Sequence, residues 1–98
     1  MESWVDGAIE QHLKFLLSPE YLEKSYSYWK MLKDEGQVGL IEDAMLGEVI
    51  GKVTSYLTIR VTYETDRVLS SLELEDFRYM INNWMMFIKM KIYEIADR

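Results

Sequence analysis

The chain has 98 residues, of which 49% are hydrophobic and 29% are charged, and its formal net charge is −6. This length and composition favour a folded globule, and we expect a single helical domain over residues 1–98. Because the sequence contains no cysteine, disulfides, zinc–thiolate sites, iron–sulfur clusters and cysteine nucleophiles are excluded.

The acidic charge also argues against two classes of partner. No cluster of Lys and Arg is present that would attract a phosphate backbone or anionic lipid, so we expect no direct nucleic-acid binding and no membrane binding. The start of the chain carries Glu2 and Asp6 where a secretory signal would carry Lys or Arg, which predicts an intracellular, cytoplasmic protein. Asn and Gln occur only twice each, a scarcity of thermolabile amides that is typical of thermophilic proteins.

A first helix is predicted over residues 3–16. Its apolar residues recur at helical spacing and extend to the residue after it: Val5, Ala8, Ile9, Leu13, Leu16 and Leu17. His12 lies at the edge of this stripe, and the pattern gives it no partner for a metal pair or a catalytic couple. We therefore assign His12 a structural or surface role.

A second helix is predicted over residues 19–34. Ser18 can cap it, Pro19 suits the first helical position, and Gly36 supplies the left-handed residue that commonly ends a helix. Its aromatic residues cover more than one face, so some of them lie at an edge or meet another chain. Tyr21 and Tyr28 form our secondary candidate for an aromatic interaction surface.

Residues 40–68 support two interpretations. A helical stripe is formed by Leu46, Ile50, Val53, Leu57, Val61 and Val68, and Gly47 with Gly51 makes a notch that another helix could approach. Residues 57–64, however, alternate between apolar and polar side chains like a half-buried strand. Because no second alternating run could pair with such a strand, we favour a third helix over 40–68, with an α+β fold and a strand near residues 56–64 as the alternative.

A fourth helix is predicted over residues 73–96, with Ser70 or Ser71 as its N-cap. Met80 and Phe87 widen its core face, and Trp84 lies at the centre of that face. The remaining members of the face are Phe77, Ile81, Met85, Ile88, Ile92 and Ile95. The fold class expected from these elements is all-α, a compact bundle of about four helices.

The far side of this fourth helix carries a second apolar strip, formed by Tyr79, Met86, Met90 and Tyr93. A monomer with one core would normally place charges there. These four residues are therefore our main candidate for a self-association or partner surface.

The sequence also has two acidic pairs, Glu20-x-x-Glu23 and Glu73-x-x-Asp76. They resemble the paired carboxylates with which all-α nucleotide pyrophosphohydrolases hold magnesium. In that family the pairs lie on consecutive helices, whereas about fifty residues separate them here, and each pair also suits the first turn of a helix. We expect no catalytic residues, no metal site and no cofactor.

The function expected from these observations is a small acidic, non-enzymatic protein–protein interaction module. Its partner would be a second copy, a homodimer first, or another protein. One alternative is a regulator or accessory subunit of nucleic-acid machinery that acts through protein contacts. A second alternative is an enzyme of the metal-dependent pyrophosphohydrolase kind.

Overall fold

Five α-helices and no strand make up residues 4–97, the part of the chain that the computed structural model describes. In chain order they are α1 Trp4–Leu16, α2 Pro19–Asp34, α3 Ile41–Thr65, α4 Ser71–Asn82 and α5 Met85–Ala96. The predicted all-α class is confirmed. The predicted number of helices is wrong, because the fourth predicted helix is divided into α4 and α5.

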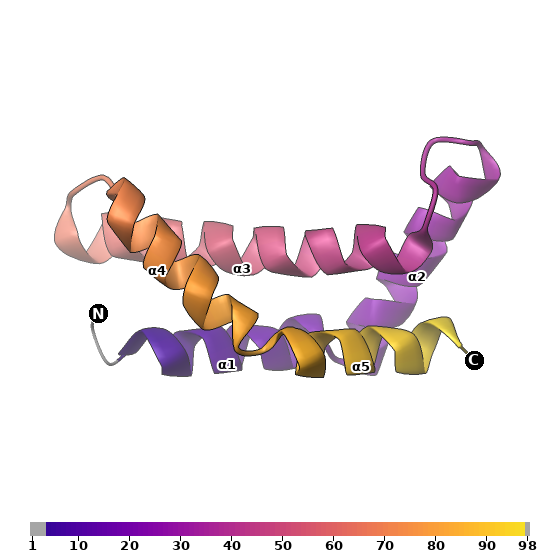
Figure 1. Cartoon of the computed structure of the whole chain (residues 1–98), viewed down its shortest axis with the longest axis horizontal. Coiled ribbons are helices and arrows are strands. Elements are labelled where there is room, and N and C mark those ends of the chain that lie inside the picture. The colour runs from indigo at the N-terminus through magenta and orange to yellow at the C-terminus, as the bar shows by residue number, and fades with distance from the viewer. Residues whose placement is uncertain (1–3, 98) are drawn as a thin grey trace.

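The longest helix, α3, contacts all four of the others. Figure 1 shows α3 running along the molecule, with α2 near its start and α4 crossing its other end, while α1 and α5 lie along the opposite side. Its 25 residues span about 37 Å at 1.5 Å per residue. That length is close to the longest dimension of the molecule, 42 Å.

The bundle is more extended than we predicted. Its dimensions are 42 × 23 × 20 Å and its Cα radius of gyration is 14.6 Å, against about 12.5 Å for a compact domain of this length. One long helix with shorter helices arranged along it accounts for this shape.

The core is a single apolar cluster to which every helix contributes. The six residues predicted as the inner face of the first helix are all buried, with none more than 6% exposed. Eighteen hydrophobic residues of the described range 4–97 are buried: Val5, Ala8, Ile9, Leu13, Leu16, Leu17, Leu22, Ile41, Met45, Val49, Val53, Leu57, Val61, Phe77, Ile81, Ile88, Ile92 and Ile95.

The strand considered near residues 56–64 does not form, because these residues continue α3. Leu57 and Val61 face the core at 0% and 3% exposure, whereas Ile59 and Tyr63 face outward at 68% and 89%. Residues two apart lie on the same face of a strand, whereas a two-residue step turns a helix by about 200°. The four apolar residues of this short run, which would share one face of a strand, are therefore divided between the inner and the outer face of α3.

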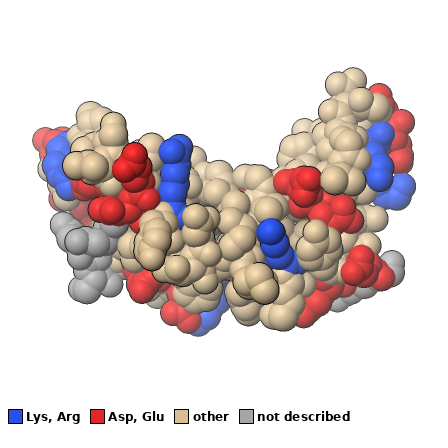
Figure 2. Space-filling view, viewed as in Figure 1, with Lys and Arg blue, Asp and Glu red and all other residues tan. Residues whose placement is uncertain are grey.

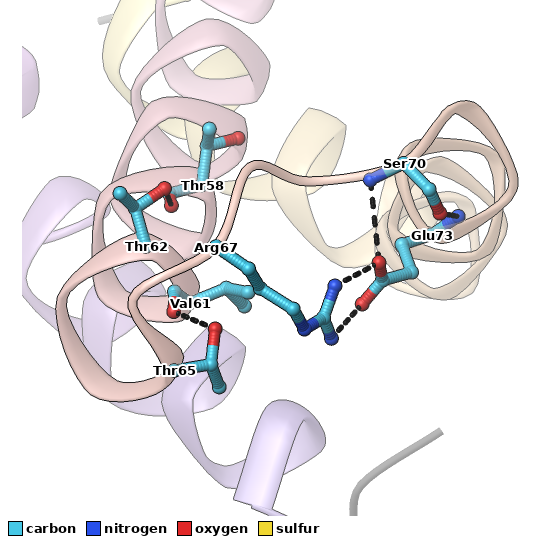
Figure 3. A network of polar contacts seen from close by, with 7 residues as sticks. All are labelled: Thr58, Val61, Thr62, Thr65, Arg67, Ser70 and Glu73. Carbon is cyan, nitrogen blue, oxygen red and sulfur yellow. Dashed lines mark hydrogen bonds and ion pairs between the residues drawn. The ribbon is translucent and has the colours of Figure 1, made fainter.

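Hydroxyl groups along α3 are also satisfied within the helix. The side chains of Thr54, Thr58, Thr62 and Thr65 each donate a hydrogen bond to the carbonyl oxygen four residues earlier, at 2.6 to 3.0 Å. Figure 3 shows the last of these, from Thr65 to Val61. These bonds satisfy the threonine hydroxyl groups within the helix, although threonine, being β-branched, is a weak helix former.

The third helix ends earlier than we predicted, at Thr65 instead of residue 68. Asp66 adopts a left-handed conformation with φ 53°, which Asp tolerates better than most residues, and its N–H bonds to the Thr62 carbonyl. Val68 therefore lies in the connection to α4 at 86% exposure and does not belong to the core stripe.

The boundaries of α2 are those that we predicted. The Ser18 side chain accepts a hydrogen bond from the Tyr21 N–H, and Pro19 is the first helical residue. At the other end Gly36 has φ 80°, and the N–H groups of Gly36 and Gln37 bond to the carbonyls of Lys33 and Leu32. This pair of bonds is the Schellman arrangement.

The boundary between α4 and α5 lies at Asn83 and Trp84. Their N–H groups bond to the carbonyls of Met80 and Ile81, three residues back, where an α-helix would use the fourth. Asn82 and Asn83 are weak helix formers. The bend directs α4 toward the end of α3 and α5 along its other half (Figure 1).

This bend changes the position of two predicted core residues. Trp84 is half-buried at the bend and not in the middle of a continuous helix. Phe87, predicted on the core face, is 41% exposed and meets the Trp84 ring edge-on at a centroid distance of 6.0 Å.

We predict that Phe77→Ala lowers the free energy of unfolding by about 3–5 kcal/mol, because the ring is 1% exposed and its removal leaves a cavity. Trp84→Ala should lower it by less, since the indole is only half-buried. Denaturant melts of both variants test this order, with Tyr79→Ala as a control at an exposed position. A larger loss for Trp84→Ala than for Phe77→Ala would contradict the assignment of Phe77 to the centre of the core.

Candidate interaction surface

The strip predicted on the far side of the last helix lies on the outside of the molecule. Tyr79 is 71% exposed, Met86 83%, Met90 50% and Tyr93 46%. Phe87, at 41%, adds to one side of the same surface. We call these five residues the outer face.

α5 carries large apolar residues on two opposite sides, and only one of these sides is covered by the rest of the molecule. In α5 the inner positions are the isoleucines Ile88, Ile92 and Ile95, each at most 7% exposed. Met86, Met90 and Tyr93 lie about half a turn away from them. In Figure 2, mostly uncharged surface, interrupted by a few basic groups, covers the middle of this side, and acidic groups lie toward both ends.

Charged residues border the outer face. Lys91 and Glu94 are three residues apart and their Nζ and Oε2 atoms lie 3.8 Å from one another. Lys89 makes no ion pair within residues 4–97, although it lines a small crevice of about 80 Å³ together with Glu42 and Asp43 of α3. Sequence reasoning did not single out Lys89 or Glu94, because their place beside an exposed face depends on knowing which side of α5 is covered.

The secondary candidates, Tyr21 and Tyr28, lie in different surroundings. Tyr28 is 51% exposed, and its ring meets that of Trp29 edge-on at 5.1 Å. Tyr21 is only partly exposed, because its hydroxyl donates a 2.7 Å hydrogen bond to the Glu48 carboxylate on α3. The two do not form one surface.

Glu48 is the centre of a polar cluster between α2 and α3. Besides the Tyr21 hydroxyl, its carboxylate accepts hydrogen bonds from the Ser25 hydroxyl at 3.3 Å and from the Trp29 indole N–H at 2.9 Å. The three donors are four residues apart along α2, so they share one side of that helix. The arrangement fixes α2 against α3.

The pKa of Tyr21 is consistent with its role as a hydrogen-bond donor to Glu48. Burial raises the pKa of the Tyr21 hydroxyl above 10, and the Glu48 carboxylate acts in the same direction while Lys52 opposes it. Tyr21 therefore remains a hydrogen-bond donor at neutral pH. The Lys52 ammonium lies 5.6 Å from the centre of the Tyr21 ring.

A second set of contacts joins α1 to α3. The His12 ring stacks on Tyr56 with centroids 4.4 Å apart and an angle of 8°, and the Arg60 guanidinium lies 4.7 Å from the Trp4 ring. Burial, and after it Lys52, lowers the pKa of His12 from its ordinary value, which favours the neutral ring. The structure thus places His12 in the packing between two helices.

The acidic pair Glu73 and Asp76 lies at the start of α4. Ser70 is the N-cap, and its side chain and that of Glu73 form a reciprocal capping box. Figure 3 shows that Glu73 also accepts two parallel hydrogen bonds from the Arg67 guanidinium, one of them at 2.6 Å from Nη2 to Oε2. The Glu73 carboxylate is thus bound by one cation, Arg67, and by the backbone N–H of Ser70.

Glu73 and Asp76 also form part of the rim of a cleft of about 380 Å³ between α1, the end of α3 and the start of α4. The buried residues Val5, Val61 and Phe77 contribute to its lining. Among residues 4–97 no group of three or more His, Asp or Glu is placed to hold a metal ion.

No family model matches the chain, and neither do curated proteins or solved structures. Within the described range, none of the helices combines the length and the apolar character needed to cross a membrane.

We predict that Glu48→Ala lowers the free energy of unfolding by about 1–3 kcal/mol, because three donors lose a charged acceptor at a partly buried position. Glu10→Ala, which removes one negative charge from an exposed position on α1, is the matched control. Thermal or denaturant melts measure both. Equal effects of the two substitutions would show that the cluster does not hold α2 in place.

We also predict an acid-dependent loss of stability that involves Glu73. Hydrogen bonds from Arg67, and after them the backbone N–H of Ser70, lower the pKa of Glu73 from 4.5 to about 2. Because the folded-state pKa is depressed, this contribution is fully present above pH 4.5 and is lost as the pH falls through about 2. The stability difference between the wild type and Glu73→Gln should therefore shrink across that window.

Carboxyl chemical shifts from NMR provide the direct measurement. The Glu73 midpoint should lie near 2 in the wild type and move toward 4.5 in Arg67→Ala. A wild-type midpoint near 4.5 would mean that the Arg67 pair is not formed in solution.

Proposed function

We propose that this protein is a self-associating helical module that forms a homodimer through the outer face of α4 and α5. The observation that supports this proposal is the exposure of five large apolar side chains, between 41% and 83%, four of them on α5 and one on α4. The role is one of binding, and the geometry of the polar clusters gives no reason to add a catalytic one.

The residue types of the outer face suit a protein interface. Tyr, Phe and Met are enriched at the centres of interfaces, where charged residues are depleted. Methionine adapts its flexible thioether to an opposing surface, and tyrosine tolerates a partly wet edge. Large contiguous apolar patches are rarely left exposed on soluble monomers, and where they occur they commonly mark interaction sites.

A second copy is the partner that we favour. Two chains of charge −6 repel one another at long range, so they would associate most easily through a face where charges are sparse. The middle of the α4–α5 side is such a region (Figure 2). Two-fold pairing of identical surfaces is the commonest closed arrangement of protein subunits.

We predict that the wild type is a dimer by light scattering at micromolar concentration and that Met86→Glu combined with Met90→Glu makes it a monomer. The two residues are 83% and 50% exposed, so the added charges disturb the outer face but not the core. Circular dichroism of the double variant should show unchanged helix content.

The matched control is Ile59→Glu combined with Tyr63→Glu, which adds the same charge at exposed positions of α3. This control should remain a dimer. A wild type that stays monomeric at high micromolar concentration would refute self-association. Dissociation of the control alone would move the interface to the outside of α3.

A further inference from the structure

We infer that the two copies pair with their α5 helices parallel, so that Lys89 of each copy forms an ion pair with Glu94 of the other. This inference rests on the proposed self-association and specifies its geometry and the residues that determine its orientation.

The exposed apolar residues of α5 follow a heptad pattern. Met86, Met90 and Tyr93 are spaced by four and three residues, which is the d, a, d sequence of a two-helix seam. Ile88, Ile92 and Ile95 occupy the opposite, buried side. A partner helix on the seam would therefore not contact the core. The other four helices of each copy would lie on the side of α5 away from the seam.

The residues beside the seam carry opposite charges. In this register Lys89 occupies position g and Glu94 position e, on opposite flanks of α5. In a parallel two-fold pair the g flank of one helix lies along the e flank of the other, which brings each Lys89 to a Glu94. In an antiparallel pair the g flank of one helix lies along the g flank of the other, and the e flank along the e flank. Lys89 of one copy then does not meet Glu94 of the other. The Lys89 and Glu94 charges therefore favour the parallel orientation, against a weaker repulsion between the two exposed Asp97 carboxylates at the end of α5.

Both charged groups are available for such a pair. Lys89 makes no ion pair within residues 4–97. Glu94 has a side chain that is 55% exposed, and its contact with Lys91 spans 3.8 Å. Exposed contacts of this length contribute little stability, so Glu94 can turn toward a partner at small cost.

The bend at Asn83 and Trp84 confines the seam to α5, since α4 turns away from its direction (Figure 1). Tyr79, on α4, therefore lies outside the seam. Asp97, one heptad after Met90, marks the C-terminal end of the seam.

Charge reversal tests the orientation. In a parallel dimer Lys89→Glu alone, or Glu94→Lys alone, turns two attractive pairs into two repulsive ones and should raise the dissociation constant about tenfold. The double variant, Lys89→Glu with Glu94→Lys, restores both pairs and should return the constant to near the wild-type value. Sedimentation equilibrium measures all four proteins.

An introduced cysteine gives an independent readout, because the chain has no cysteine of its own. Two copies of Asp97→Cys lie side by side only in the parallel arrangement, where the spacing of a positions permits a disulfide, and they should cross-link under mild oxidation. Ser55→Cys, exposed on the outside of α3, is the control and should not cross-link.

The outcomes separate this inference from the proposed function. A wild type that is monomeric at high micromolar concentration refutes both. A second result is a dimeric wild type for which both single reversals have the wild-type dissociation constant and Asp97→Cys does not cross-link. This result keeps the self-association but refutes the parallel orientation. Weakening by each single reversal, with recovery in the double variant, supports it.

Discussion

The fold depends on the spacing of the buried residues in α3. Six of them, Ile41, Met45, Val49, Val53, Leu57 and Val61, follow one another at intervals of four. Each interval exceeds one helical turn by about 40°, so the buried stripe winds around roughly half of the helix between its two ends. A straight helix with such a stripe offers differently directed apolar surfaces along its length. This explains how α3 contacts all four other helices without a common bundle axis, and why the molecule is longer than a compact bundle of the same size.

The attachment of α2 shows a different principle, because α2 buries little apolar surface. Leu22 is its only buried hydrophobic residue, and Ser25 is the only buried polar residue in the described part of the chain. The Glu48 carboxylate compensates for this by accepting hydrogen bonds from three side chains of different length. Short Ser25 lies centrally, and the longer Tyr21 and Trp29 reach the same carboxylate from the turns on either side. Hydrogen bonds to a charged acceptor are stronger than those between neutral groups.

Sequence reasoning succeeded where a local signal is sufficient. The inner face of α1, the Ser18–Pro19 start and Gly36 end of α2, and a serine cap of α4, at Ser70 or Ser71, were all predicted from nearby residues. It failed where the result depends on tertiary contacts. No Pro or Gly marks the bend at Asn83. The predicted stripe of α3 was right for Val53, Leu57 and Val61, but its first half was assigned to Leu46 and Ile50, which are only half-buried, because several faces of that helix are apolar. The exposure of Tyr79, Met86, Met90 and Tyr93 followed from the pattern, but the bond between Tyr21 and Glu48 could not, since 27 residues separate them.

Both sides of α5 carry large apolar residues, but they differ in the kind of residue. Isoleucine, which has few rotamers, occupies the inner side, where a fixed set of neighbours surrounds it. Methionine and tyrosine occupy the outer side, where a contact must form and separate in water. The outer face alone would allow several ways of association, because apolar contacts have little directional preference. Charged residues that border such a face restrict these possibilities by opposing the wrong orientations. In α5 the apolar residues would supply most of the affinity, and Lys89 and Glu94 would select the orientation.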